Sequence, residues 1–503
     1  MRNSIFFFAF ISLLFVGCSD LADAELPAYE PEFAIPILEE AIVTVPAVWQ
    51  SNDPNQSLVI SPAGQLIFKY QSPETTIQAK DLLGGTLAFL LRATVPLNDN
   101  KVPLLPDDLE VELSVEEAVL VGGLFNLTYN TDNFSGDSID IVFTIPELTR
   151  NGEPLQFFTN STQANFVSTS IEGYTARPTN NQLTITYTAI NKSGVPQEIS
   201  DITMLFSPQI QVLKGFLGRQ EIIIPTAVIP IDLFDDRFLN GTIQFAEPKI
   251  SARAENAFGV PVRTQINILN AFRPDGESVL IDARAIDNQD INYPSVNNIG
   301  ANEVTELYLD HTNSNLPVVF NKEVAAVEYG LTAVINADDD STIVSFLTDS
   351  SFFKIQIFVE VPVIGSVKDF STEGTYAVSL AEELEEIESI KEGEIKLIIE
   401  NGIPLEAKVQ VNFLDESGVV LDSLFQEQRT IASGAPIDEK GFTTGVQESI
   451  NFIPITGKQI DAIQETASIQ VKAIFNTSGS LKEPVHILDT QELRVRMGLR
   501  FSL

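Results

Sequence analysis

Short segments in which apolar and polar residues alternate recur along the chain after its first fifty residues. An alternation with period two, bounded by Gly, Pro, Asn or Asp, is typical of strands with one buried face. Helical periodicity is limited to two short stretches, 380–390 and 460–467. The sequence therefore predicts an all-β fold of tandem antiparallel β-sandwich domains with short helices at most. The alternating segments include 65–70, 109–115, 138–145, 182–190 and 354–361.

Two stretches 145 residues apart repeat one order of signals. In the first, a strand-like segment ends at Asn256 and is followed by Gly-Val-Pro at 259–261, an apolar segment and an Asp-Gly turn. In the second, Asn401 is followed by Gly-Ile-Pro at 402–404 and the same succession, and a fainter copy surrounds Asn191. Asparagine and glycine suit left-handed backbone positions, and proline fixes φ where the next strand begins. Each unit is predicted to be a strand, a corner, a long strand and a hairpin.

This order of strand, Asn-x-x-Gly-Val-Pro and strand resembles the β-sandwich of the late-embryogenesis-abundant type. The larger succession resembles uncharacterised Bacteroidota-type outer-membrane or surface lipoproteins, over roughly half of the chain. The resemblance implies an architecture and a location, and it implies no activity. The matching stretches are 215–225, 241–261, 358–365 and 401–424.

The first residues contain Cys18, the only cysteine of the chain. Arg2 gives a positive start, and the apolar run 5–16 is shorter than the roughly 20 residues of a spanning helix, so residues 1–17 are predicted to be a signal peptide. The run 15–18 resembles the lipobox of bacterial lipoproteins, with phenylalanine where leucine is usual. The resemblance implies that Cys18 is acylated and anchors the protein in a membrane. The alternative is an ordinary secreted protein with one stray cysteine.

Residues 18–48 are rich in Asp, Glu and Pro, which predicts an extended, solvated tether after the lipidated cysteine. Acidic residues at this place resemble the surface-export signal of Bacteroidota-type lipoproteins. The resemblance implies an outer-membrane location and leaves the cell surface and the periplasmic face open. Beyond the tether we expect three units: an N-terminal β domain at 49–235, a β-sandwich at 236–345 with the Asn256 corner, and a C-terminal β-sandwich at 346–503 with the Asn401 corner.

Charge and residue types narrow the function classes. With 69 acidic and 30 basic residues the formal net charge is −39, which repels phosphate backbones and excludes nucleic acid as an expected partner. The two histidines, His311 and His486, lie at expected strand ends, and neither is near a Gly-x-Ser-x-Gly turn. A surface or structural role is expected for each. We therefore expect no enzymatic activity and no cofactor.

One loop has the alternating oxygen-bearing residues typical of calcium sites. Ser341 stands where an EF-hand turn needs glycine, and Leu347 stands where its bidentate glutamate should be. We expect a solvated acidic hairpin tip there rather than a metal site. The candidate ligands are Asn336, Asp338, Asp340 and Thr342, with Asp287, Asp290 and Asn292 as a weaker second cluster.

Three Asp-Ser triplets resemble the O-glycosylation motif used on exported Bacteroidota proteins. The resemblance implies Ser138, Ser341 and Ser423 as candidate acceptors.

The expected function is that of a non-enzymatic, lipid-anchored structural, scaffold or adhesion component of the cell envelope, with outer-membrane proteins as partners. The alternative is a carrier of lipid or another apolar ligand, which would need an apolar tunnel of several hundred cubic ångströms where a scaffold has a filled core. Glycan binding and glycoside hydrolysis are least favoured. Sugars stack on Trp and Tyr, and the chain has one Trp, Trp49, and nine Tyr against 33 Phe.

Overall fold

The described part of the protein is mostly β-strand, which confirms the all-β prediction. Three short helices accompany them: α2 (Ala79–Leu82), α3 (Leu316–Val319) and α5 (Gly457–Gln464). α5 covers most of the helical stretch expected at 460–467, whereas 380–390 lies outside the described residues. The computed structural model describes residues 32–44, 55–82, 91–96, 98–105, 113–132, 134, 138–163, 165–231, 233, 238–377, 392–427, 429–477 and 484–502.

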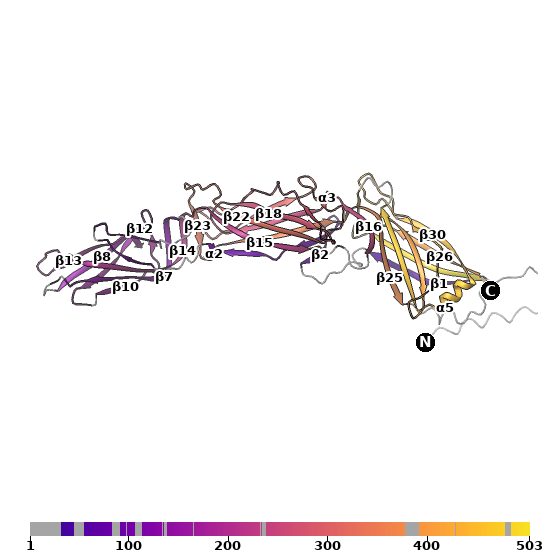
Figure 1. The fold of residues 1–503 in the computed structure, drawn as a ribbon, viewed down its shortest axis with the longest axis horizontal. Coiled ribbons are helices and arrows are strands. Elements are labelled where there is room, and N and C mark those ends of the chain that lie inside the picture. The colour runs from indigo at the N-terminus through magenta and orange to yellow at the C-terminus, as the bar shows by residue number, and fades with distance from the viewer. Residues whose placement is uncertain are drawn as a thin grey trace, which may run out of the picture.

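The strands form three units in an elongated row (Figure 1). We call the unit farthest from the chain ends the tip domain. Its main sheet has the order β13-β8-β11-β7-β14-β23, with β9 on β8, β10 on β7 and β5 on β14, and β12 pairs with β6. Its strands are β5 (Leu91–Thr94), β6 (Lys101–Pro103), β7 (Ser114–Asn130), β8 (Ile139–Arg150), β9 (Glu153–Asn160), β10 (Phe166–Ser170), β11 (Thr175–Ala176), β12 (Gln182–Thr184), β13 (Thr186–Asn191), β14 (Ser200–Phe216) and β23 (Ser345–Thr348).

The middle sandwich has one sheet of order β2-β3-β24-β17-β21, with β4 on β24, and a second of order β15-β22-β18-β19, with β20 on β18. Its strands are β2 (Gln56–Ile60), β3 (Leu66–Gln71), β4 (Thr75–Gln78), β15 (Gln220–Pro230), β17 (Lys249–Asn256), β18 (Val262–Phe272), β19 (Ser278–Leu280), β20 (Asp290–Ile291), β21 (Glu303–Leu309), β22 (Ala326–Ile335) and β24 (Phe352–Pro362).

The proximal sandwich holds both ends of the described chain, because β1 pairs with β33. Its sheets have the orders β1-β33-β26-β30 and β16-β25-β31-β27-β28, with β29 on β27 and β32 on β25. Its strands are β1 (Glu32–Thr44), β16 (Phe238–Phe245), β25 (Ile364–Ala377), β26 (Glu392–Asn401), β27 (Leu405–Leu414), β28 (Val420–Ser423), β29 (Arg429–Ala432), β30 (Gln447–Thr456), β31 (Ser468–Thr477), β32 (Val485–His486) and β33 (Glu492–Ser502).

The chain path through these units is nested. It starts in the proximal sandwich, passes through the middle sandwich to the tip domain, and returns with excursions in both directions. β16 leaves the middle sandwich to pair with β25, and β23 leaves it to pair with β14. The sheets therefore do not coincide with the expected contiguous ranges 49–235, 236–345 and 346–503. Alternation identifies a strand, but it does not say which distant strand completes the sheet.

The corners at Asn256 and Asn401 have the same geometry. Each asparagine ends a strand, is almost fully buried, and accepts a bond through Oδ1 from the backbone N–H two residues later, at 2.9 Å in both cases. Neither residue has a positive φ, so the expected left-handed backbone is wrong there. The side chain caps the strand end instead, as in an Asx turn. Positive φ occurs at the hairpin glycines, Gly276 at 86° and Gly418 at 81°.

After each corner the chain crosses to the other sheet of its sandwich. β17 and β18 lie in opposite sheets, as do β26 and β27, and both β18 and β27 continue into a hairpin, with β19 and β28. The turn at Asn191 differs, because β13 and β14 belong to one sheet.

A strand exchange joins the tip domain to the middle sandwich. β23 lies between two strands of the middle sandwich in sequence, yet it pairs with β14 of the tip domain. Phe346 in β23 also exchanges two backbone hydrogen bonds with Gly259, each 3.0 Å long. A Cβ on Gly259 would lie 2.0 Å from the Phe346 ring. This joint therefore depends on a glycine that lets a buried ring meet the backbone.

The joint between the middle and proximal sandwiches centres on Gln65. Its Nε2 lies 3.1 Å from the carbonyl oxygen of Val363 and 3.0 Å from that of Ile487. Its Oε1 is 3.0 Å from Nδ1 of His486. Backbone bonds run beside it from Ile487 to Val363 and from Val363 to Leu66. One amide side chain thus ties together three segments from two sandwiches.

The core is continuous from the tip domain through the middle sandwich. One cluster of buried apolar residues contains Phe125 and Phe206 of the tip together with Tyr329 and Phe353 of the middle sandwich. The proximal sandwich has two smaller clusters, and a fourth around Leu66 lies at its joint with the middle sandwich.

Candidate functional site

In the loop that contains the calcium candidates, the side-chain oxygens of Asn336, Asp338 and Asp340 accept hydrogen bonds from protein groups. Both carboxylate oxygens of Asp338 accept bonds from the Arg263 guanidinium, at 2.7 and 3.0 Å, which holds the pKa of Asp338 below its ordinary value. Asp340 accepts from the hydroxyl and the N–H of Thr342, at 2.7 and 2.9 Å, which lowers its pKa as well. Asn336 is buried, and its Oδ1 accepts from the N–H of Asp340.

Arg263 links this loop to the second candidate cluster. Its Nε donates to Asp290 at 2.7 Å, so one guanidinium lies between the carboxylates of Asp290 and Asp338. Asp287 accepts from the backbone N–H of Ile266, and the Asn292 amide bonds to Val304. The structure therefore joins the two clusters around an arginine, a pairing that was not expected from the sequence. Within the described residues, no group of three or more His, Cys, Asp or Glu side chains is arranged to hold a metal ion.

The two histidines belong to different sandwiches. His311 follows β21 in the middle sandwich and is exposed. His486 lies at the proximal joint, where its ring stacks on Phe442 with centroids 3.9 Å apart. Burial lowers the pKa of His486, against the opposing effect of Glu247 and Asp438. Its place beside Gln65 gives it a role in the joint.

The three candidate acceptor serines differ in accessibility. Ser341 is exposed in the loop beside Asp340. Ser138 and Ser423 are half-buried, and their hydroxyls donate to Asn160 and Asn412, each at 2.8 Å. Ser341 is therefore the most accessible of the three.

Cys18, residues 19–31 and 45–48 of the expected tether, and Trp49 lie outside the described residues. The tether prediction is wrong for residues 32–44, which form β1 and pair with β33 of the proximal sandwich. Apolar residues between the acidic and proline residues of this segment suit a strand, and an open sheet edge supplies its hydrogen-bond partners. In the part of the chain that is described, no helix has the length and apolarity to cross a membrane.

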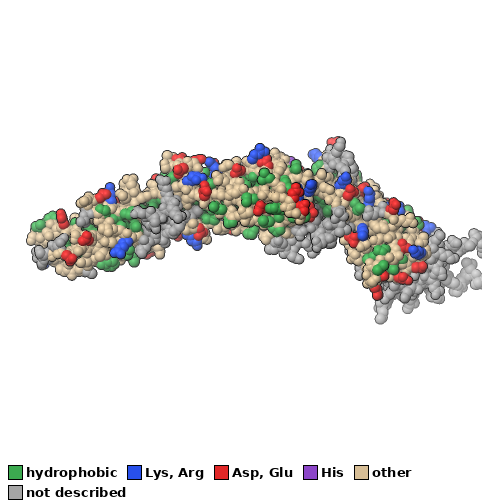
Figure 2. Space-filling model, in the orientation of Figure 1, with side chains coloured by type: hydrophobic (Ala, Val, Ile, Leu, Met, Phe, Trp, Pro, Cys, Tyr) green, Lys and Arg blue, Asp and Glu red, His purple; other side chains and the backbone are tan. Residues whose placement is uncertain are grey.

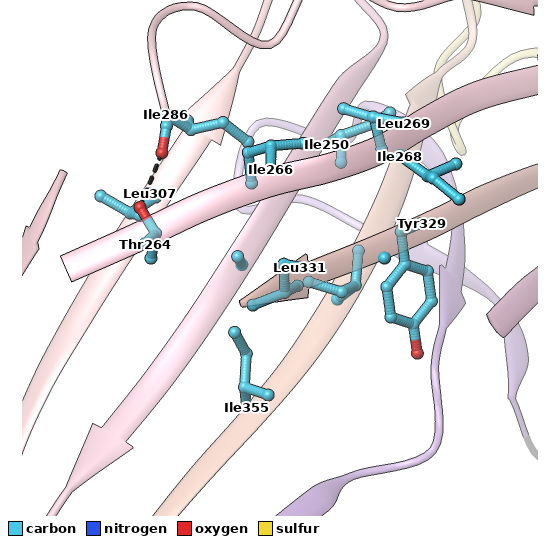
Figure 3. A pocket seen from close by; sticks show the side chains of 13 residues that line it. Ile250, Thr264, Ile266, Ile268, Leu269, Ile286, Leu307, Tyr329, Leu331 and Ile355 are labelled. Atoms are coloured by element: carbon cyan, nitrogen blue, oxygen red, sulfur yellow. Dashed lines mark hydrogen bonds between the residues drawn. The ribbon is translucent and has the colours of Figure 1, made fainter. Parts of the chain in front are cut away.

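An apolar cavity lies between the two sheets of the middle sandwich (Figure 3). Ile266, Leu331 and Ile355 line it, and the nearby Thr264 hydroxyl donates to the carbonyl of Ile286 at 2.9 Å. Its volume is about 30 Å³, room for about one or two water molecules and far below the roughly 150 Å³ of a cavity that admits benzene. This cavity cannot enclose a lipid chain.

The outer face of β9, β8 and β13 in the tip domain was not singled out from the sequence. Strand register places its residues in three rows, and we call this face the distal platform. Phe158 is 73% exposed in the middle row, on the outer strand β9, beside half-buried Val142. A sequence signal exists: residues 155–171 contain no Asp, Glu, Lys or Arg. The rows are Asn160, Asp140 and Ile190; Phe158, Val142 and Thr188; and Gln156, Thr144 and Thr186.

Hydrogen bonds orient the polar side chains of the distal platform. Asn160 donates to Asp140 at 2.7 Å, while its Oδ1 accepts from Ser138 and Thr162. Gln156 donates to Thr144 at 3.2 Å. Apolar side chains, in green, are visible at the outer end of the tip domain among tan atoms of uncharged polar side chains and backbone (Figure 2).

Comparison with known proteins gives weak likenesses. No family model and no curated protein matches the chain. Among solved structures, a predicted secreted protein of Parabacteroides distasonis is 12% identical, with a TM-score of 0.32, over 94% of this chain and 99% of that one. A structure of infectious bursal disease virus, Gx strain, is 8% identical with a TM-score of 0.15, over 90% of this chain and 81% of that one. A tandem CBM22 domain of Paenibacillus barcinonensis Xyn10C is 7% identical with a TM-score of 0.14, over 57% and 94%. Scores this low assign no function.

Proposed function

We propose that this protein is a non-enzymatic, lipid-anchored component of the bacterial cell envelope that acts as a scaffold or adhesion element. The observation that carries the proposal is the elongated arrangement of the tip domain, the middle sandwich and the proximal sandwich. Both ends of the described chain meet in the proximal sandwich, and the tip domain lies at the opposite end (Figure 1). A protein anchored near one end of such a row presents its other end away from the anchor.

The two joints support a role that needs a stiff spacer. The tip domain and the middle sandwich share one core and exchange β23. The middle and proximal sandwiches are tied by the Gln65 contacts. Separate domains on flexible linkers would move independently, whereas backbone pairing across a joint opposes bending.

The anchor in this proposal is Cys18, acylated after removal of residues 1–17. Glu32, the first residue of β1, lies fourteen positions after Cys18, a reach of at most about 50 Å at full extension. Several acyl chains give a stable anchor, at about 0.8 kcal/mol per buried methylene. The proximal sandwich would then stay near the outer membrane, on its surface or its periplasmic face.

The matching corners at Asn256 and Asn401 support a duplicated origin for the middle and proximal sandwiches. β17 lies between β21 and β24, as β26 lies between β30 and β33. Duplication of a sandwich unit lengthens the protein, and a longer protein can hold its tip domain farther from the anchor. The acidic surface would favour outer-membrane partners with basic patches, in associations that salt weakens.

The anchor is tested by replacing Cys18 with serine in cells fed labelled fatty acid. We expect label on the wild-type protein and none on Cys18→Ser, which should leave the membrane fraction or keep its signal peptide. Ser19→Ala is the matched control and should be labelled normally. Wild-type protein that carries no label would contradict the anchor, and turnover of a polysaccharide, ester or peptide substrate would contradict the non-enzymatic assignment.

A further inference from the structure

We propose that the distal platform binds a neutral oligosaccharide. The inference deepens the proposed function, because it names what an envelope-anchored tip would hold. It is carried by four features of the face that point to one ligand chemistry: its exposed aromatic ring, its hydrogen-bonding groups, its low charge and its size.

The first feature is the exposed ring in the middle row. Phe158 is 73% exposed on β9, and its cross-strand partner Val142 is half-buried on the same face. Ile190, 44% exposed, extends the apolar surface to β13. A sugar ring has an apolar face that can cover an aromatic side chain, and removing this ring from water is favourable at about 25 cal/mol per Å² of apolar area.

The second feature is the chemistry around the ring. Amide and hydroxyl groups both donate and accept, as the hydroxyl rim of a sugar requires. Gln156 and Asn160 flank Phe158 on β9, and Thr188 lies across the platform on β13. Hydrogen bonds to Thr144 and Asp140 partly fix the orientation of Gln156 and Asn160 in advance, which lowers the entropy cost of binding.

The third feature is charge. Asp140 is the one ionisable side chain among the nine platform residues, and it accepts a bond from Asn160. The platform has no Lys or Arg, so nothing on it would pair with a sulfate, phosphate or uronate. A glycan with such groups would meet one carboxylate and a protein of net charge −39. The ligand chemistry that fits is therefore neutral.

The fourth feature is the size of the platform, which favours a glycan over a protein as the ligand. Three strands at about 4.8 Å spacing and five residues along each at about 3.4 Å per residue give a face of roughly 250 Å². A stable protein interface needs about 800 Å² on each side. The platform fits a few sugar rings and is too small for a protein by itself.

The test uses the purified chain from residue 19 on immobilised polysaccharides: neutral glucan, mannan and galactan, with pectate and heparin as acidic probes. We expect retention on at least one neutral polymer that Phe158→Ala weakens about tenfold or more. Gln156→Ala should weaken it less. Phe166→Ala, which removes a 51% exposed ring from β10, outside the nine platform residues, should leave retention unchanged.

Retention by the acidic polymers alone, no retention by any neutral polymer, or equal loss in Phe158→Ala and Phe166→Ala would overturn the proposal. The result is independent of the anchor. Full-length Phe158→Ala should fractionate with membranes like the wild type. A wild-type protein that is labelled with fatty acid and binds no glycan would contradict the glycan site and leave the lipid anchor standing. A wild-type protein that binds a neutral glycan and carries no fatty acid would contradict the lipid anchor and leave the glycan site standing.

Discussion

The middle and proximal sandwiches have the same strand neighbours and differ in how they are packed. In both, the strand before the asparagine corner has two partners in one sheet, and the strand after it pairs with a hairpin partner and a long strand in the other. The inward residues of β24, Ile355, Ile357 and Val359, are all buried. Val411 and Phe475 in the proximal sandwich are only half-buried.

The difference shows that connectivity and packing have separate causes. The corners and hairpins depend on local signals, which the two units share. Packing depends on neighbours, and the middle sandwich is closed by a joint at each end while the proximal one has a single joint. Because it buries less apolar surface in smaller clusters, the proximal sandwich should open first when the protein unfolds.

The largest expected effect comes from the cores. Phe353→Ala removes a fully buried ring that stacks on Phe258 with centroids 6.5 Å apart, and should cost about 4 kcal/mol of unfolding free energy. Phe413→Ala in a small proximal cluster should cost about 3 kcal/mol and loosen that sandwich alone. Denaturant unfolding followed by hydrogen exchange would measure both. Faster exchange in the tip domain for Phe413→Ala would contradict two separable cores.

The next largest effect is expected at the joint between the tip domain and the middle sandwich, where Gly259 contacts Phe346. Gly259→Ala places a Cβ 2.0 Å from the Phe346 ring and should cost about 3 kcal/mol, with faster exchange in β23. Gly402→Ala is the matched variant at the proximal corner, where the nearest atom is the Glu492 carbonyl oxygen at 3.1 Å. It should cost about 1 kcal/mol or less. Equal losses for the two glycines would remove the distinction between the corners.

The smallest effect concerns pH at the proximal joint. Burial lowers the pKa of His486 below its ordinary value of 6.5, so the folded joint binds a proton less readily than the unfolded chain. The stability it contributes is present above pH 6.5 and is lost as pH falls from there through the lowered value. Thermal midpoints from pH 7.5 to 5 should fall more steeply for the wild type than for His486→Gln. His311→Gln is the control, and identical slopes in all three proteins would refute a titrating joint.

Particular residues show how far the sequence could be read. The strands at 65–70, 138–145 and 354–361 correspond to β3, β8 and β24, because alternation is a local property. The corners at Asn256 and Asn401 lie where the repeat puts strand ends, although through side-chain capping rather than left-handed backbone. The candidate ligand Asp338 was assigned to a solvated loop, and its partner Arg263 lies 75 residues away, beyond any local pattern. The distal platform had a compositional signal, but three strands had to be placed side by side before it became a face.

The sequence by itself determined the all-β class, several strand positions and the strand ends at the two asparagine corners, because each depends on the side chains of neighbouring residues. Only the tertiary structure decided which strands pair, and therefore that β23 completes the tip sheet and β16 the proximal one. The physical reason is that hydrogen bonding between strands is the same for every backbone, so a strand's partner is chosen by long-range packing. Phe346 against Gly259 and Gln65 against the distant carbonyl groups of Val363 and Ile487 are contacts of that kind.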